Sequence, residues 1–457
     1  MSNPGEADAT PITDPRQLAD YLAAGGKPPS AWRIGTEHEK FGFRHTDLRP
    51  PPYQPGGIQA MLDGFRRFGW QPILDGGQPI GLKGDAARAG ASVSLEPGGQ
   101  FELSGGLLDT VHDTRRELER HFAEVRAVGD ELGLGFAPLG FHPTMTRAEM
   151  PWMPKTRYAV MRRYMPHRGK LGLDMMLRTC TVQVNLDFAD EADMVRKMRV
   201  GLALQPLATA LFANSPFAEG RPNGYFSYRA QIWTDTDPDR TGIPPIVFED
   251  GFGFERYADW VLDVPMYFII RDGAFIDAAG ASFRDFLHGR LPQRPGERAT
   301  LGDFADHLTT VFTDVRLKRF LEMRGADAGS APMMLASAAF WVGLLYDGAA
   351  LAAAEALVRE HPWTDFAALR AEVPRRGLDT PWQRGRLRDL ARAVVAIATE
   401  GLAARARRDA EGDDERMYLA PLSEIAAGAP TQAEYWLQRY HGAWREDVRR
   451  IFAEAAI

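Results

Sequence analysis

Four segments of the chain alternate apolar and polar residues, as half-buried strands do. The clearest is "TCTVQVNLDF" (179–188), in which every second residue is apolar. The segments "IGTEHEKFGF" (34–43) and "RFLEMRGAD" (319–327) show the same period over shorter runs. The segment "SVSLEPGGQFELSG" (92–105) has two alternating arms around a Pro-Gly-Gly turn. The patterns therefore predict three strands and one hairpin.

Apolar residues spaced three and four apart predict helices elsewhere. Before residue 330 such stripes lie at 14–27, 56–70 and 113–134. Beyond residue 330 the pattern is mainly helical, and residues 1–11 are polar, which predicts a flexible tail. Strands joined by hairpins and mixed with helices indicate an α+β protein with a mainly antiparallel sheet. No linker-like stretch divides the chain, so we expect one domain over 12–457, sheet-rich over 12–330 and helical over 331–457.

Each predicted strand carries acidic or amide side chains on one face, because side chains alternate along an extended chain. Pairing of Glu96 with Gln100 across the turn would set Ser94 opposite Glu102 and leave both hairpin glutamates on one side. The acidic candidates from all strands are Glu37, Glu39, Glu96, Glu102 and Glu322, and the polar strand face adds Gln183 and Asn185.

Two interpretations of these faces are open. A one-sided antiparallel sheet commonly turns its polar face to water. Against this, Phe41 and Phe43 share the face of Glu37 and Glu39, and lysine is nearly absent from these faces. The helices also supply enough apolar surface to cover one sheet face, which would leave the other to line a cleft.

If the faces converge, five carboxylates share one cavity, and like charges in a confined site raise one another's pKa unless cations are present. Carboxylate, amide and hydroxyl oxygens favour Mg²⁺, with Mn²⁺ as an alternative, over zinc. Mg²⁺ ions held in this way usually bridge phosphate oxygens, which points to a nucleotide. Arg178, Arg229 and Arg324 stand near these strands and could bind carboxylate or phosphate. Lys83, on a Gly-rich approach to the hairpin, could reach a phosphate.

Composition narrows the class of protein. The 457 residues carry a formal charge of −7 without a basic tract, so we expect no nucleic-acid partner. The longest apolar runs, 200–212 and 331–346, are shorter than the roughly 20 residues of a membrane span.

The only cysteine, Cys180, lies on the apolar face of its strand, where burial is expected. Lacking a secretory or transit signal, the protein is expected in the cytoplasm. The sequence contains no P-loop, no second histidine of H-E-x-x-H after "HEKFG" and no G-x-S-x-G.

Six segments occur in the order found in plant-type glutamate–cysteine ligases, and the chain resembles this family from about residue 12 to its end. They are "GTEHEKFGF", "SVSLEPGGQFELSG", "MPKTRYAVMRRYMP", "RTCTVQVNLDF", "NGYFSYRAQIWTDTDPDRTG" and "LEMRGAD". The resemblance implies a curved, mainly antiparallel sheet like that of the glutamine synthetase catalytic domain, with ATP and Mg²⁺ on its concave face. It also implies ligation of L-glutamate to L-cysteine, the first step of glutathione synthesis.

Site roles implied by the resemblance are carried over by motif. Glu37, Glu39, Glu96, Glu102 and Glu322 resemble the metal-binding acids, and Gln183 and Asn185 match the polar strand face beside the metals and nucleotide. Arg178, Arg229 and Arg324 resemble the residues that hold glutamate or the transferring phosphoryl group, and Tyr158, Tyr228 and Trp233 resemble pocket walls. The plant members also carry a transit peptide and regulatory cysteines, neither of which we find here.

Three alternatives remain open at this stage. A ligase of the same fold could join a different acid or amine. A non-catalytic relative could sense nucleotide or thiol. The protein could be a monomer or a homodimer.

Overall fold

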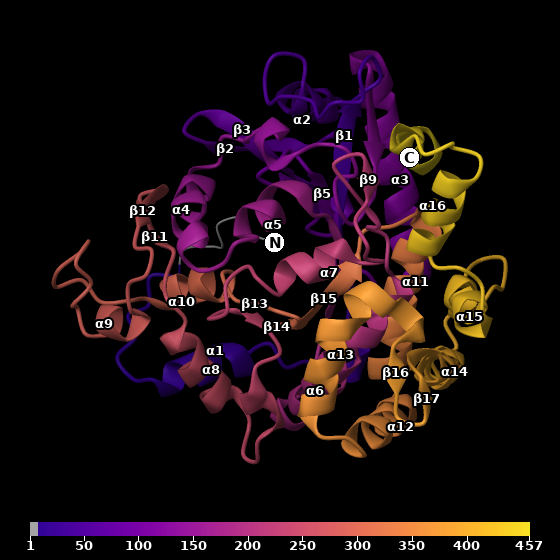
Figure 1. The fold of residues 1–457 in the computed structure, drawn as a ribbon. Helices are drawn as coiled ribbons and strands as arrows, with labels where there is room; N and C mark the ends of the chain where they lie inside the picture. Colours follow the sequence, from indigo (N-terminus) through magenta and orange to yellow (C-terminus); the bar gives the residue numbers. More distant parts are fainter. Residues whose placement is uncertain (1–7) are drawn as a thin grey trace.

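The computed structural model describes residues 8–457 and centres on a nine-stranded sheet (Figure 1). The strand order is β14-β15-β7-β1-β5-β4-β3-β2, with β6 also paired to β1, and every neighbouring pair is antiparallel. The strands are β1 (Ile34–Arg44), β2 (Gln71–Asp75), β3 (Gln78–Lys83), β4 (Ser92–Leu95), β5 (Phe101–Ser104), β6 (Leu134–Ala137), β7 (Thr181–Leu186), β14 (Val315–Leu317) and β15 (Leu321–Asp327). The predicted α+β fold with a mainly antiparallel sheet is confirmed.

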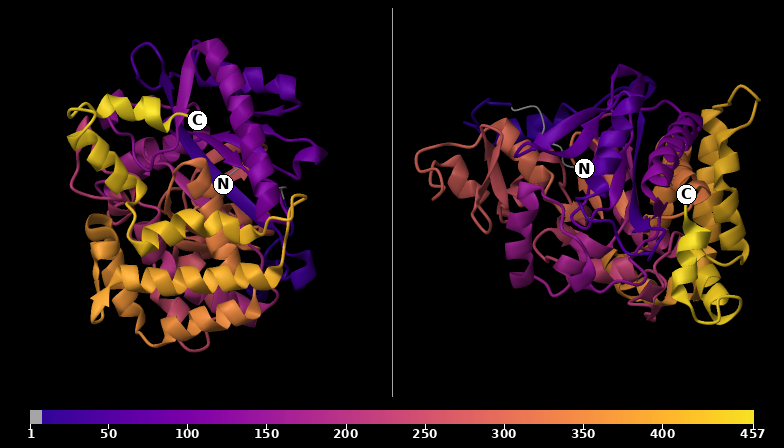
Figure 2. Two further views of the ribbon diagram at one scale, coloured as in Figure 1. Left: turned by 90° about the vertical axis from the view of Figure 1, so that its right-hand side faces the viewer. Right: turned by 90° about the horizontal axis from the view of Figure 1, so that it is seen from above.

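Helices surround this sheet, and those after residue 330 gather on one side of the molecule (orange to yellow in Figures 1 and 2). Before residue 330 they are α1 (Arg16–Ala23), α2 (Ile58–Phe65), α3 (Val111–Leu132), α4 (Thr156–Tyr164), α5 (Gly172–Arg178), α6 (Glu191–Leu211), α7 (Tyr228–Trp233), α8 (Phe254–Asp263), α9 (Phe283–Leu287) and α10 (Leu301–Leu308). The later ones are α11 (Ala331–Leu345), α12 (Gly348–Arg359), α13 (Trp363–Arg376), α14 (Leu387–Arg405), α15 (Ala420–Ala427), α16 (Gln432–His441) and α17 (Ile451–Ala455).

Four small strand pairs complete the described part of the chain. They are β8 (Phe217–Ala218) with β9 (Arg221–Pro222), β10 (Thr241–Gly242) with β13 (Phe312–Thr313), β11 (Phe268–Arg271) with β12 (Ala274–Asp277), and β16 (Pro381–Trp382) with β17 (Gly385–Arg386). Most of the predicted tail, residues 1–7, lies outside the described residues. The next residues lie against the start of α10, where the Ile12 amide donates to the Ala299 carbonyl.

The hairpin forms in the predicted register. The Glu96 amide donates to the Gln100 carbonyl at 3.0 Å, and Ser94 pairs with Glu102. Gly99 occupies the turn with φ of +84°, a conformation that glycine adopts without the steric cost a side chain would bring. This register places the side chains of Glu96 and Glu102 on the same face of the hairpin.

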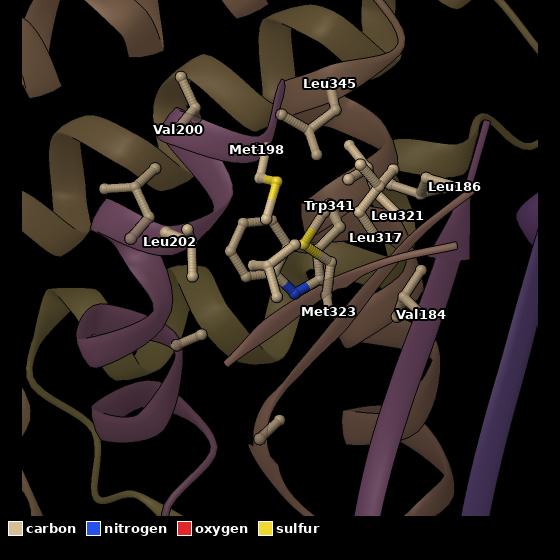
Figure 3. Packing of buried hydrophobic residues seen from close by; sticks show 14 of the residues in the cluster. Val184, Leu186, Met198, Val200, Leu202, Leu317, Leu321, Met323, Trp341 and Leu345 are labelled. Atoms are coloured by element: carbon tan, nitrogen blue, oxygen red, sulfur yellow. The ribbon is translucent and has the colours of Figure 1, made fainter. Parts of the chain in front are cut away.

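The apolar face of the sheet packs against α6 and α11. Val184 and Leu186 of β7 and Met323 of β15 contact Met198 of α6 and Trp341 of α11 in one buried cluster (Figure 3). All five side chains are at most 2% exposed. Because these strands bury one face under helices, their polar side chains are directed to the opposite face.

The two phenylalanines of β1 pack in a separate cluster with the C-terminal helices. Phe43 lies 4.9 Å from Phe452, measured between ring centroids, and Phe41 belongs to the same cluster with Trp444. Cys180 is fully buried in this cluster, as predicted. The C-terminal segment therefore covers the far end of β1, so these phenylalanines are shielded from water without lining a cleft.

No single helix of residues 8–457 has both the length and the apolar character of a membrane span. The pair α11 and α12 reaches that length only together, and it bends by 89°.

Candidate functional site

The strand order places the five predicted glutamates on adjacent strands. Glu322 of β15 is paired with Asn185 of β7, and Gln183 of β7 is paired with Glu37 of β1. On the other side of β1, Glu39 is paired with Glu102 of β5. Glu96 follows β4 at the turn of the hairpin. Acids separated by up to 285 positions in sequence thus share one face of the sheet, as predicted.

A cavity with about 680 Å³ of empty space opens on this face. Helices α5 and α7, which lie in front of the sheet in Figure 1, supply part of its wall. The lining residues are Glu39, Glu96, Pro97, Gln100, Arg157, Tyr158, Met161, Met175, Met176, Thr179, Thr181, Gln183, Arg229, Trp233, Phe312, Arg316 and Arg324. Acids and strand amides form the floor, and aromatic residues, methionines and arginines form the walls.

Two of the buried carboxyl groups, those of Glu39 and Glu102, have raised pKa values. Burial, together with the charge of Glu96, raises the pKa of Glu39 to about 8, although the Thr181 amide donates to its Oε2 at 2.9 Å. Burial and the charges of Glu96, Glu37 and Glu39 raise the pKa of Glu102 well above its ordinary value. Burial therefore disfavours the ionised form of both groups, and the neighbouring carboxylates add to this effect.

Glu322 is in the opposite electrostatic state. Burial opposes its ionisation, but Arg316, Lys318 and Arg324 hold its pKa well below the ordinary value. Arg316 binds it through two donors, with Nε 2.9 Å from Oε2 and Nη2 2.7 Å from Oε1. Arg324 donates to Glu322 and also to the Oε1 of Gln183. This end of the floor is a compensated ion cluster.

Helix α7 brings Arg229 and Trp233 to the cavity. Arg229 is 3% exposed, and its Nη2 donates to the Arg324 carbonyl at 2.9 Å. The Trp233 Nε1 atom is buried without a hydrogen-bond partner within residues 8–457. On another wall, the Tyr158 hydroxyl donates to the Leu95 carbonyl at 2.6 Å. These three predicted side chains lie on the cavity wall.

Seven of the predicted residues are not among the cavity-lining residues. Four of these, Glu37, Glu102, Glu322 and Asn185, lie on the same sheet face beside it, and the other three lie apart from the acids. Arg178 forms ion pairs with Asp174 (2.5 Å) and Glu219 (3.0 Å), and Tyr228 lines a neighbouring surface hollow with it. Lys83 is exposed at the end of β3, near the edge of the sheet. The structure therefore separates Arg178, Tyr228 and Lys83 from the acids with which the sequence grouped them.

Sequence reasoning missed several basic residues of the site, Lys318 among them. Arg157 lines the cavity, and Lys155 is buried beside the hairpin, where its Nζ donates to the Ser94 hydroxyl at 2.7 Å. Burial lowers the pKa of Lys155 to about 8. Arg316 was overlooked although the short hairpin of β14 and β15 pairs it directly with Glu322. The run "VRLKRFLEMR" carries that signal, because Arg316 and Lys318 alternate onto one face.

The acidic floor offers oxygen atoms to a divalent cation. Within residues 8–457 no three His, Cys, Asp or Glu side chains are already arranged as ligands of one metal ion. However, among the described residues the buried Oε2 atom of Glu102 and Oδ1 atom of Asn185 have no hydrogen-bond partner, and burial raises the pKa of Glu39 to about 8. Buried oxygens without partners, beside acids that resist ionisation, are what a carboxylate cage shows without its cation. The donor set fits Mg²⁺ or Mn²⁺.

Comparison with known proteins assigns the chain to a family. The model of "Glutamate-cysteine ligase family 2" matches residues 33–454. The chain belongs to glutamate–cysteine ligase family 2. It is 50% identical to the chloroplastic glutamate–cysteine ligases of Medicago truncatula and Arabidopsis thaliana over 99% of its length, covering 88% and 85% of those proteins.

A solved structure shares the fold at low sequence identity. The glutamate–cysteine ligase of Francisella tularensis in complex with AMP superposes with a TM-score of 0.53 at 10% identity, over 93% of this chain and 88% of that one. One prediction from the sequence is wrong by these comparisons. The family members to which this chain is about 50% identical are chloroplastic proteins, which contradicts the expected cytoplasmic location.

Proposed function

We propose that this protein joins the γ-carboxylate of L-glutamate to the amine of L-cysteine while ATP is cleaved to ADP and phosphate. Full-length membership of the glutamate–cysteine ligase family supports this reaction. The observation that carries it is the gathering of five glutamates on one face of the sheet, where Glu39 and Glu96 line a cavity together with Arg229 and Arg324. In glutathione-producing organisms this ligation is the first step of glutathione synthesis.

The chemistry explains why such a cavity is needed. A carboxylate is a poor electrophile at neutral pH, so its oxygen first attacks the terminal phosphorus of ATP, and ADP leaves. The resulting γ-glutamyl phosphate contains a good leaving group. The cysteine amine then attacks the acyl carbon, loses a proton and expels phosphate, which forms the amide. The reaction requires no protein nucleophile, in keeping with the burial of Cys180.

Acidic, basic and amide side chains of the site would have different roles in this reaction. Glu37, Glu39, Glu96, Glu102 and Glu322 would hold the divalent cations. Mg²⁺, when bound there, neutralises charge on the phosphate oxygens of ATP. Arg229 and Arg324 place guanidinium groups beside the same floor, where they bind the anionic substrate or the transferring phosphoryl group. Gln183 and Asn185 supply amide contacts between the acids.

The cavity wall protects the intermediate. Met161, Met175, Met176 and Phe312 form the apolar part of the wall, and Trp233 continues it. A wall of this kind limits access of water, and an acyl phosphate shielded from water reacts with the bound amine in preference to being hydrolysed. The same wall bounds the space into which the amine substrate fits.

The test is product formation by the purified protein with ATP, Mg²⁺, L-glutamate and a panel of amines. We expect ADP release to depend on cysteine, and on its analogue 2-aminobutyrate, and we expect Glu39→Ala to lower the rate by at least about 100-fold with the fold retained. If cysteine and 2-aminobutyrate fail while another amine reacts, the protein is a ligase of different specificity. Negligible turnover by wild type and variant alike would favour a sensor.

A further inference from the structure

A buried carboxylate outside the cavity, that of Asp327, links helix α7, which carries Arg229, to strand β15, which carries Arg324. Asp327, the last residue of β15, is 1% exposed. Its Oδ2 atom accepts from the Asn214 amide (2.9 Å) and the Ser215 hydroxyl (2.6 Å), and its Oδ1 atom accepts from the Ser227 hydroxyl (2.8 Å). Asp327 is not among the cavity-lining residues.

The hydroxyl groups of Ser215 and Ser227 also form hydrogen bonds with the start of α7. Because each hydroxyl donates its only proton to Asp327, its lone pairs are free to accept. The Ser215 oxygen accepts from the Arg229 amide at 3.1 Å, and the Ser227 oxygen accepts from the Ala230 amide at 3.2 Å. These two amides belong to the first turn of α7, where backbone donors lack partners within the helix.

Helix α7 depends on such support. It has six residues, far fewer than an isolated helix needs to be stable in water. Its second and last residues, Arg229 and Trp233, line the cavity. The side chain of Arg229 reaches the carbonyl of Arg324, three residues before Asp327 on the same strand. A carboxylate at the end of β15 therefore fixes α7 relative to the strand that carries Glu322 and Arg324.

We infer that Asp327 is a positioning residue, which sets the Arg229 guanidinium in the cavity by orienting the Ser215 and Ser227 hydroxyls that cap α7. Asp327 touches neither substrate nor reacting atoms and acts through Arg229. The negative charge of Asp327 also favours the charged form of the buried Arg229 guanidinium, whose pKa burial lowers. This leaves the cavity side of Arg229 available to an anionic substrate. The inference rests on the proposed function only in naming L-glutamate as that substrate.

The kinetic test is a double-mutant cycle with Asp327→Asn and Arg229→Lys. An asparagine amide turns a donor toward one of the groups that now donate to Asp327, so Arg229 loses its set position. We expect Asp327→Asn to raise the KM for glutamate about tenfold, with the KM for ATP within about twofold of wild type. In the Arg229→Lys background the same change should alter the KM for glutamate by less than about twofold. Equal effects in both backgrounds would overturn the inference, because a general loss of structure does not depend on residue 229.

Two further measurements keep the test decisive. Ser227→Ala removes one capping hydroxyl and leaves the carboxylate, so it should raise the KM for glutamate by a smaller factor, about threefold, even if Asp327→Asn folds poorly. A crystal structure of Asp327→Asn, or of Ser227→Ala if the first does not fold, should show Arg229 Nη2 beyond hydrogen-bond distance of the Arg324 carbonyl. A retained contact near 2.9 Å would contradict the inference. This result is independent of turnover, so it stands apart from failure of the proposed ligase activity.

Discussion

Replacing Arg316 by methionine tests the buried ion cluster at one end of the acidic floor. Arg316 and Glu322 are 1% and 0% exposed, and three N–O contacts of 2.7 to 2.9 Å join them. Removal of one member of a buried ion pair typically costs about 3–5 kcal/mol, because the remaining charge is left desolvated. Lys318, with its Nζ 3.0 Å from Glu322, and Arg324 remain in Arg316→Met. We therefore expect a loss near the lower limit, about 3 kcal/mol of unfolding free energy.

The chain offers a matched control at its surface. Arg284 binds Asp263 in the same two-donor geometry, with contacts of 2.6 and 2.9 Å, but their side chains are 38% and 67% exposed. Exposed pairs contribute about 0–1 kcal/mol, since water solvates either partner once the other is removed. Arg284→Met should therefore lower the free energy of unfolding by less than about 1 kcal/mol.

Urea unfolding at pH 7, followed by tryptophan fluorescence, measures both variants against wild type. The slope of free energy against urea concentration must agree among the three proteins for the comparison to be valid. Equal losses in the two variants, or a loss below about 1 kcal/mol for Arg316→Met, would refute the argument that burial makes this pair strong.

Three other results are expected. In steady-state kinetics, Lys83→Ala should leave kcat/KM within about twofold of wild type, because Lys83 is exposed at the end of β3. Lys155→Met should lower kcat/KM by at least about tenfold, because a buried cation beside Glu96 and Glu102 is lost. Burial lowers the pKa of His307 from 6.5 to about 4. The unfolded chain therefore binds a proton at His307 before the folded protein does, and the free energy of unfolding falls as pH drops from about 6.5 to about 4. In unfolding titrations across that range, this decline should be smaller in His307→Gln by up to about 3 kcal/mol. Phe43→Ala should cost about 3–5 kcal/mol in the same assay, and a cost under about 1 kcal/mol would show that its contacts with the C-terminal segment are weak.

Local pattern predicted much of the fold because the signals that define it are local. Alternation in 179–188 placed Val184 in the core and Gln183 on the polar face, and the Pro-Gly-Gly turn fixed the register that sets Ser94 opposite Glu102. The order of the strands comes from packing between distant segments, and here the resemblance to a family supplied what alternation could not.

The residues that the structure places apart from the acids, and those that the sequence did not single out, have equally local explanations. Arg178 and Arg229 look alike as arginines beside strands, but Asp174, four residues before Arg178 on the same helix, binds Arg178 outside the cavity. Lys83 was placed by a glycine-rich context, which says nothing about the direction of its side chain. Arg316 lies on a three-residue strand, too short for alternation to be recognised. Pairwise charge spacing, Asp174 to Arg178 and Arg316 to Glu322, would have corrected two of these assignments.

The most direct test of the central claim is anomalous diffraction from crystals grown with Mn²⁺ and a non-hydrolysable ATP analogue. We expect manganese peaks among the carboxylates of Glu37, Glu39, Glu96, Glu102 and Glu322, with the terminal phosphate of the analogue on the same ions and facing Arg229. Manganese and nucleotide bound elsewhere on the protein, with this acidic floor empty, would contradict it.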